Sequence, residues 1–163
     1  KLWALKFNKK ICGVYQIMKL KKIFTEKNIA LDFEFDNAIE AIIQGGNLLF
    51  ESGITTEIYT DEMIKSYKKL GAYMVISPGI AVPHARPNYG VLKTGISFIR
   101  VKTPIYFGNK ENDPVKLIFC IAGTTDDNHI EIIQSLSEIL FDKKLMEKII
   151  NSKTKGEFLS LFD

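Results

Sequence analysis

The residues best suited to chemistry lie in residues 77–88, which read SPGIAVPHARPN. His84 directly follows a short apolar strand predicted to end at Pro83, and Pro87 lies three residues further on. Proline fixes its own φ angle and restricts the residue before it, so the backbone around His84 has little freedom. A neutral imidazole held in this way can act as a nucleophile, a base or a ligand. The alternative is an ordinary histidine in a turn or in a satisfied polar pocket.

Arg86 lies two residues after His84 and is one of only two arginines in the chain. Its planar guanidinium carries several N–H donors in a geometry that suits a phosphate or a carboxylate. Residue types and spacing together therefore predict a presented histidine with an anion-binding neighbour.

The second histidine, His129, lies in the first turn of a helix predicted over residues 128–141. An apolar strand predicted over residues 115–122 precedes that helix, and sites in open α/β sheets often lie at such strand ends. Free N–H groups at a helix N-terminus favour an anion and disfavour imidazolium. We therefore expect His129 to be neutral and able to donate a hydrogen bond to a phosphoryl oxygen. A solvated first-turn histidine is the equally simple alternative.

Several motifs of other enzyme classes do not occur in the sequence. It has neither a GxxxxGK[ST] loop nor a GxGxxG segment for nucleotide binding, no HExxH or CxxC for metal, and no GxSxG elbow. No cofactor is therefore expected. A metal site built from the two histidines and scattered carboxylates is left as an alternative, although their spacing matches no metal signature.

Length and composition are those of one globular domain. The chain has 163 residues, of which 46% are hydrophobic and 25% charged. Its two cysteines, Cys12 and Cys120, form no motif, and Cys120 lies in an apolar run where a buried thiol is expected. The absence of a disulfide framework favours a reducing cytoplasm. No apolar run approaches the roughly 18 residues that a membrane span needs.

The net charge of +3 comes from one end of the chain. Residues 1–22 hold seven lysines and no acid, and the remaining 15 basic side chains face 19 acidic ones, a balance of −4. A nucleic-acid partner is disfavoured, since that function needs basic residues on a folded face. Residues 1–17 are interpreted as a basic leader of unknown origin, and the domain is predicted to cover residues 18–163.

Strands alternate with helices along the chain, which predicts an α/β fold with helices on both faces of a sheet. A helix is expected from a cap at Asp36 or Asn37 to Gly53, and a second from an N-cap at Thr60 to Gly71. The glycine pair at 45–46 either weakens the first helix or marks close packing. The other predicted elements are strands over residues 29–35, 73–76, 94–101 and 115–122, a short edge strand over 104–107, a turn over 109–114, and helices from about 128, 142 and 154. The helix over 128–141 is expected to bury Ile130, Ile133, Leu136 or Ser137, and Leu140.

The segment PGIAVPH, residues 78–84, resembles the active-site segment of the enzyme IIA domains of the bacterial sugar phosphotransferase system, in the mannitol/fructose (type-2) superfamily. The wider stretches at residues 71–87, 90–95 (GVLKTG) and 112–115 (NDPV) look closest to the ascorbate-type branch. His129, followed by a leucine-containing helix, matches the family's second histidine. The resemblance runs from about Met18 to Phe162.

This resemblance implies a mixed sheet between helical layers and a phosphotransferase activity. It implies that His84 accepts a phosphoryl group, on its tele nitrogen, from the carrier protein HPr and passes it to a cysteine of a IIB component. The IIB component then serves a membrane IIC permease during uptake of a sugar, here of the ascorbate type. His129 would stabilise the phosphoryl group. A regulatory module of the same fold, in which the phosphorylation state of His84 controls a binding partner, is the alternative.

One region departs from the family pattern. Many mannitol and fructose members carry an Arg-Glu pair before the Pro-His segment, with the arginine near the active histidine. Residues 67–71 of this chain read YKKLG instead. No residue is therefore assigned to that role, and Arg86 is a candidate phosphate-binding residue only because it is near His84 in the sequence.

Overall fold

A computed structural model describes residues 22–163 of the chain. The predicted leader over residues 1–17 and the predicted domain start at residue 18 lie outside the described residues. Within residues 22–163, no helix combines the length and the apolar character that crossing a membrane requires.

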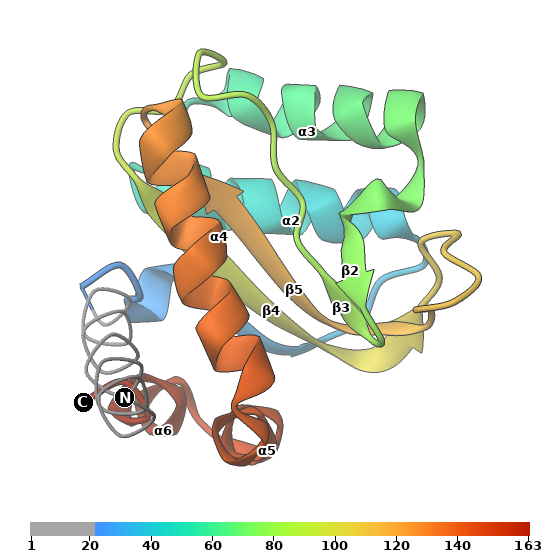
Figure 1. Cartoon of the computed structure of the whole chain (residues 1–163), viewed down its shortest axis with the longest axis vertical. Helices are drawn as coiled ribbons and strands as arrows, with labels where there is room; N and C mark the ends of the chain where they lie inside the picture. Colours follow the sequence, from blue (N-terminus) through green and yellow to red (C-terminus); the bar gives the residue numbers. More distant parts are fainter. Residues whose placement is uncertain (1–21) are drawn as a thin grey trace, which may run out of the picture.

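The centre of the molecule is a mixed five-stranded sheet (Figure 1). Its strands are β1 (Ile29–Phe33), β2 (Val75–Ser77), β3 (Ile80–Ala81), β4 (Gly95–Ile105) and β5 (Val115–Ala122), in the order β1-β4-β5-β3-β2. β5 pairs antiparallel with β4 and parallel with β3. The most apolar strand therefore occupies the middle of the sheet, as its composition predicts.

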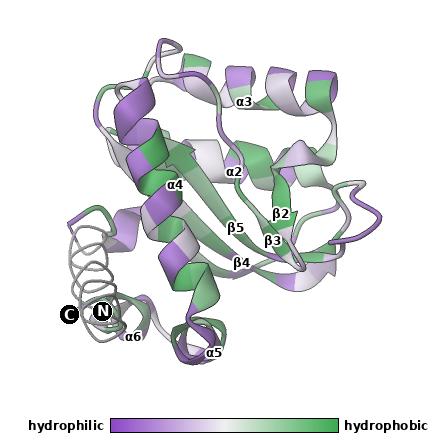
Figure 2. Cartoon of the chain, viewed as in Figure 1, coloured by the Kyte–Doolittle hydropathy of each residue, from purple (hydrophilic) through white to green (hydrophobic). Residues whose placement is uncertain are grey.

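Helices cover both faces of the sheet, which confirms the predicted fold class (Figure 1). One face is covered by α2 (Ala38–Glu51) and α3 (Glu57–Leu70), and the other by α4 (Asp126–Phe141), α5 (Lys143–Asn151) and α6 (Lys155–Ser160). Along β5, Ile118 and Cys120 face the first layer, whereas Leu117, Phe119 and Ile121 face the second. This period-two alternation divides the core into two apolar clusters, and Figure 2 shows the apolar residues concentrated along the strands.

The glycine pair in α2 is explained by close packing. A Cβ on Gly45 would lie 2.2 Å from Cys120 Sγ, and a Cβ on Gly46 would lie 2.1 Å from Thr60 Oγ1. One glycine thus lets the helix approach β5, and the next lets it approach α3. The predicted N-cap of α2 at Asn37 is also confirmed, because its side chain accepts from Glu40 N at 3.1 Å.

Several predicted element boundaries are wrong. The strand predicted over residues 73–76 is β2 at Val75–Ser77, because Tyr73 belongs to the 3-10 helix η2 (Ala72–Met74), and the strand predicted over residues 29–35 ends at Phe33. α3 begins at Glu57 after an N-cap at Thr56, one turn earlier than predicted, because Thr60 is a buried residue of the helix that packs on Gly46. Pro104 does not start a separate edge strand, because β4 continues to Ile105 through an irregularity after Arg100. An irregular ladder tolerates the missing N–H group of a proline.

The predicted apolar face of α4 is also largely wrong. The helix buries Ile132, Ser135, Leu136 and Ile139, whereas Ile130 is 52% exposed and Ile133 is 36% exposed. The sequence carries two apolar stripes at helical spacing, and only the stripe through Ile132 and Ile139 faces the sheet. The second stripe, with Ile130 and Ile133, lies on the surface next to His129.

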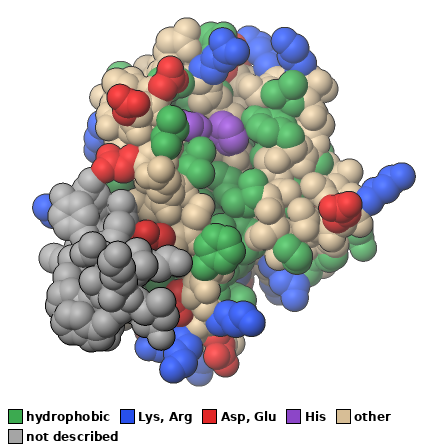
Figure 3. Space-filling model, in the orientation of Figure 1, with side chains coloured by type: hydrophobic (Ala, Val, Ile, Leu, Met, Phe, Trp, Pro, Cys, Tyr) green, Lys and Arg blue, Asp and Glu red, His purple; other side chains and the backbone are tan. Residues whose placement is uncertain are grey.

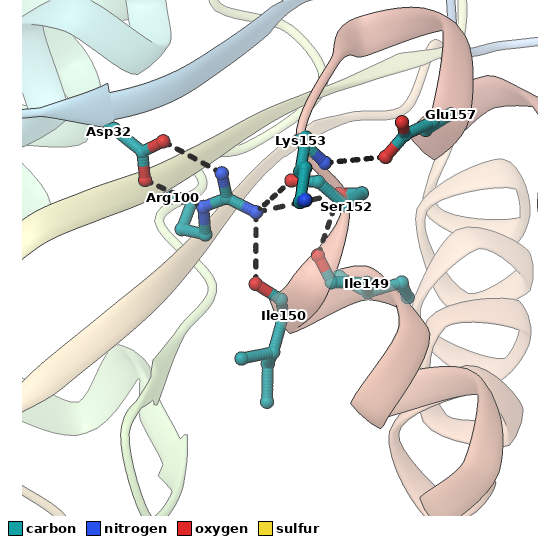
Figure 4. Close-up of polar contacts among 7 residues, drawn as sticks. All are labelled: Asp32, Arg100, Ile149, Ile150, Ser152, Lys153 and Glu157. Atoms are coloured by element: carbon teal, nitrogen blue, oxygen red, sulfur yellow. Dashed lines mark hydrogen bonds and ion pairs between the residues drawn. The ribbon is translucent and has the colours of Figure 1, made fainter.

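Arg100, the second arginine of the chain, ties the C-terminal helices to the sheet (Figure 4). Its Nε and Nη2 atoms donate to the two carboxylate oxygens of Asp32, each at 2.8 Å, and Nη1 donates to Ile150 O at 2.9 Å and to Ser152 O at 2.5 Å. The guanidinium lowers the pKa of the Asp32 carboxyl through this bidentate contact. Arg100 is therefore engaged in structure and is not free to act beside His84.

Candidate active site

His84 lies just beyond the end of β3, where Ala81 is followed by Val82 and Pro83. Its Nδ1 atom lies 2.7 Å from the carbonyl oxygen of Val82. A carbonyl oxygen can only accept, so the neutral ring carries its proton on Nδ1. This tautomer leaves the lone pair on Nε2, which is the nitrogen available to attack an electrophile.

The surroundings of His84 keep the ring neutral. The side chain is half-buried, and desolvation lowers the pKa of its imidazole below 6.5, against a smaller opposing effect of the Val82 carbonyl. Tyr73, in the 3-10 helix η2 (Ala72–Met74), packs edge-on against the ring, with ring centroids 5.5 Å apart. The site therefore presents a nucleophilic nitrogen in its reactive form near neutral pH.

His129 lies on the first turn of α4, and its ring centroid is 5.0 Å from that of His84. Desolvation lowers the pKa of His129, and a charge on His84 would lower it further, whereas Asp126 opposes both effects. Its Nδ1 atom is buried and has no hydrogen-bond partner in the described part of the chain. A buried N–H without an acceptor costs free energy, so the proton of the neutral ring is better placed on Nε2.

A tight loop between β5 and α4 positions His129. Gly123 ends the strand, and a Cβ there would lie 2.6 Å from His129 N and 2.7 Å from His129 Cα. Thr125 caps the helix, since its side chain accepts from Asn128 N, and its carbonyl accepts from His129 N at 2.9 Å. Thr94 and Thr124 join their hydroxyls at 3.2 Å, which holds the loop to the start of β4. His129 is therefore fixed by backbone contacts rather than by its own side chain.

Arg86 is exposed and makes no hydrogen bond or ion pair through its guanidinium with another described residue. It lines a cavity of about 530 Å³ together with Pro87, Asn88 and the first residues of the α4 loop, Thr124 to Asp126. The cavity connects the loop after His84 with the helix that carries His129. The structure therefore places Arg86 on a cavity that neither histidine lines.

The two predicted histidines come together from positions 45 residues apart in the chain, on two neighbouring elements. Figure 3 shows them on the molecular surface, with hydrophobic side chains on either side. Tyr73 and Gly123 were missed from the sequence. An aromatic residue before a strand gives no local signal of a ring contact, and Gly123 gives only the general signal of a glycine at a strand-to-helix turn.

Residues 22–163 match the family of the phosphoenolpyruvate-dependent sugar phosphotransferase system, EIIA 2. The chain is 32% identical over 148 residues to the ascorbate-specific PTS system EIIA component of Escherichia coli K12, which covers 90% of this chain and 96% of that protein.

Two solved structures are also similar. The mannitol-specific cryptic phosphotransferase enzyme IIA CmtB of Escherichia coli aligns with a TM-score of 0.77 at 31% identity, over 88% of this chain and 97% of that one. Enzyme IIA of the mannitol system, in complex with phosphorylated enzyme IIB from Escherichia coli, aligns with a TM-score of 0.74 at 29% identity, over 85% of this chain and 96% of that one. The sequence match covers the whole described part of the chain, and the same part holds the pair formed by His84 after β3 and His129 on α4. The chain belongs to the EIIA type-2 family of sugar phosphotransferase system components, which are phosphotransferases.

Proposed function

We propose that His84 accepts a phosphoryl group from phospho-HPr on Nε2 and passes it to a cysteine of a IIB component. The observation that carries this proposal is the contact between His84 Nδ1 and Val82 O, at 2.7 Å. It fixes the tautomer that leaves Nε2 unprotonated, and Nε2 is the tele nitrogen. Burial adds to this effect by holding the pKa of the ring below its ordinary value.

The transfer forms one bond and breaks one. The lone pair of His84 Nε2 attacks phosphorus while the bond from phosphorus to its donor nitrogen on HPr breaks, and the electron pair of that bond returns to the donor nitrogen. The ring becomes an imidazolium that keeps its proton on Nδ1. The Val82 carbonyl accepts from that N–H and so stabilises the positive charge that develops. Attack by a IIB thiolate reverses these steps and restores the neutral ring.

His129 and Arg86 have different proposed roles. With its proton on Nε2, His129 donates a hydrogen bond to an oxygen of the phosphoryl group bound to His84, which the 5.0 Å separation of the rings allows. Its neutral state, favoured by desolvation, lets it give up that contact when the group leaves. Arg86 is exposed on the adjoining cavity and attracts the phosphoryl group at longer range, where its effect is screened by salt.

The surface around the pair suits a protein donor and a protein acceptor. Ile130 and Ile133 on α4 and Tyr73 and Ile76 around β2 all expose more than a third of their surface. Apolar side chains around a reactive group are typical of a docking site for another protein. The solved complex of the mannitol enzyme IIA with phosphorylated enzyme IIB supports a IIB partner for this chain. A membrane IIC permease would then be reached through that IIB component.

The name of the related Escherichia coli protein supports ascorbate, or a sugar acid like it, as the transported substrate. We also propose a cytoplasmic location, because the IIB cysteine must stay a free thiol to accept the phosphoryl group, and thiols stay reduced in the cytoplasm.

Reconstitution of the full relay tests this function. Phosphoenolpyruvate, enzyme I, HPr, this chain and an ascorbate-type IIB component are mixed, and the phosphoryl group is followed by mass. We expect label on the IIB cysteine only when this chain is present. Label that stays on this chain while every tested IIB component is left unmodified would contradict the relay and favour the regulatory alternative.

A further inference from the structure

Beyond Ala81 the ladder between β3 and β5 is incomplete: Pro83 has no N–H to donate, and a second bond is missing beside His84. The two strands pair in parallel with Ala81 opposite Ile118, so an unbroken register places His84 opposite Ile121. In that register His84 is flanked by two backbone hydrogen bonds to Ile121. The first of them is present, because Ile121 N donates to Pro83 O at 3.1 Å. In a regular parallel ladder the next bond runs from Ala85 N to Ile121 O.

The hydroxyl of Tyr59, from the first turn of α3, occupies the place of that bond. Ala85 N donates to Tyr59 Oη at 3.1 Å, and Tyr59 Oη lies 2.6 Å from Ile121 O and 3.3 Å from Ala85 O. A phenol has a single proton to donate, and Ile121 O at 2.6 Å is its closer acceptor. One oxygen atom therefore separates two backbone groups that would otherwise meet at about 2.9 Å.

The bridge is built from a fully buried side chain. Tyr59 has no exposed surface, and burial is the main cause that raises its pKa. The phenol is therefore protonated at every physiological pH and always able to donate. Pro83 on one side of His84 is bonded to β5 directly, and Ala85 on the other side is bonded to β5 only through Tyr59.

We propose that Tyr59 is a positioning residue, whose hydroxyl bridge between Ala85 N and Ile121 O holds the His84 segment away from β5. Without that oxygen, Ala85 can close the ladder onto Ile121 or leave both groups unpaired, and either outcome reorients the imidazole relative to Val82 and His129. The consequence for phosphoryl transfer rests on the proposed function of His84, whereas the bridge itself does not.

The test is Tyr59→Phe, which removes the hydroxyl and keeps the ring. Tyr67→Phe is the matched control, because Tyr67 lies on the same helix and donates its hydroxyl to Phe107 O at 2.7 Å, away from His84. Two readouts are compared: the rate of phosphoryl acceptance from phospho-HPr, and the ring ¹⁵N resonances of His84. For Tyr59→Phe we expect acceptance roughly tenfold slower or more, with His84 no longer held as the single Nδ1–H tautomer. Tyr67→Phe should keep the wild-type tautomer and a rate within about twofold of wild type, since its lost hydrogen bond affects folding only.

A rate and a tautomer unchanged in Tyr59→Phe would overturn the proposal. If that variant does not fold, NMR of the wild-type protein tests whether the Tyr59 hydroxyl bridge is present. We expect a slowly exchanging Tyr59 hydroxyl proton with a nuclear Overhauser contact to the Ala85 amide. A scalar coupling across a direct hydrogen bond from Ala85 N to Ile121 O would refute the bridge. Neither NMR measurement needs HPr, so a wild-type chain that accepts no phosphoryl group would contradict the proposed function alone.

Discussion

Replacing Gly123 by alanine should displace His129 while both histidines keep their identity. The new Cβ would lie 2.7 Å from His129 Cα, and unstrained carbon atoms sit about 3.5 Å apart, so the two backbones must separate by roughly 0.8 Å. The contacted atoms belong to the backbone of α4, which cannot rotate away as a flexible side chain can. The first turn of α4 must therefore move relative to the end of β5.

A shift of this size matters more for transfer than for folding. Overpacking at a tight site costs about 1–3 kcal/mol of unfolding free energy. A misplacement near 1 Å of a group that contacts the transition state can slow a reaction by about 10²-fold. His129 is one of several contributors, so we expect Gly123→Ala to slow acceptance by roughly tenfold to hundredfold.

The assay is the rate of phosphoryl acceptance from phospho-HPr under single-turnover conditions, with thermal unfolding measured in parallel. Gly156→Ala is the control, because a Cβ there meets only Thr154 Oγ1, at 3.8 Å, on α6. The control should transfer at the wild-type rate.

A double-mutant cycle separates displacement of His129 from a general loss of structure. If Gly123→Ala acts through His129, it should have little further effect in a His129→Ala background, where acceptance is already slow. Full additivity of the two substitutions, or a Gly123→Ala variant with the wild-type rate, would refute the reasoning.

Three further predictions follow from the same geometry. The folded-state pKa values of His84 and His129 both lie below 6.5, so the unfolded chain binds protons first as pH falls. The unfolding free energy should therefore decrease as pH drops below about 6.5. Urea titrations from pH 8 to 5 measure this dependence, which should be weaker in the His84→Ala/His129→Ala double variant. Arg100→Ala should lower the unfolding free energy by about 2–3 kcal/mol, because its hydrogen bonds to Asp32 and Ile150 are lost. Lys102→Ala is the control, since the ion pair of Lys102 is exposed and 3.3 Å long. In the same urea titration it should change the unfolding free energy by at most about 0.5 kcal/mol. Arg86→Ala should slow acceptance only a fewfold, and the difference from wild type should shrink as salt rises; a salt-independent loss would place Arg86 in direct contact with the phosphoryl group.

Much of the architecture could be predicted from local signals in the sequence. The continuous apolar run of Val115 to Ala122 identified the central strand, and the cap at Asn37 with the stripe that follows identified α2. The short apolar run before Pro83 likewise placed His84 at the end of a strand, and the structure has β3 end at Ala81, just before it. These signals depend on neighbours in the chain, which the sequence contains in full.

The errors arise where distant contacts decide between two local solutions. Thr56 and Thr60 are both acceptable helix caps, and packing of Thr60 on Gly46 selects the earlier one. The late predicted start left Tyr59 outside the helix, so its bridge to Ala85 could not be foreseen. The two apolar stripes of α4 are likewise equivalent until the sheet buries one of them.

The two histidines of the candidate site could be singled out from the sequence, but their geometry could not. The sequence identifies His84 and His129, yet no local pattern reports that their rings lie 5.0 Å apart. Nor does it report the contact between His84 Nδ1 and Val82 O, which leaves Nε2 unprotonated. That contact depends on the turn the chain takes after β3, and the turn depends on the pairing of β3 with β5.

The proposed relay depends on His84 as the residue that carries the phosphoryl group. Intact mass spectrometry after incubation with phosphoenolpyruvate, enzyme I and HPr tests it most directly, on the wild-type chain and on His84→Ala. We expect one acid-labile phosphoryl group on the wild-type chain, none on His84→Ala, and one on His129→Ala formed more slowly. A phosphoryl group that persists on His84→Ala, or a wild-type chain left unmodified by an HPr that phosphorylates another enzyme IIA, would contradict it.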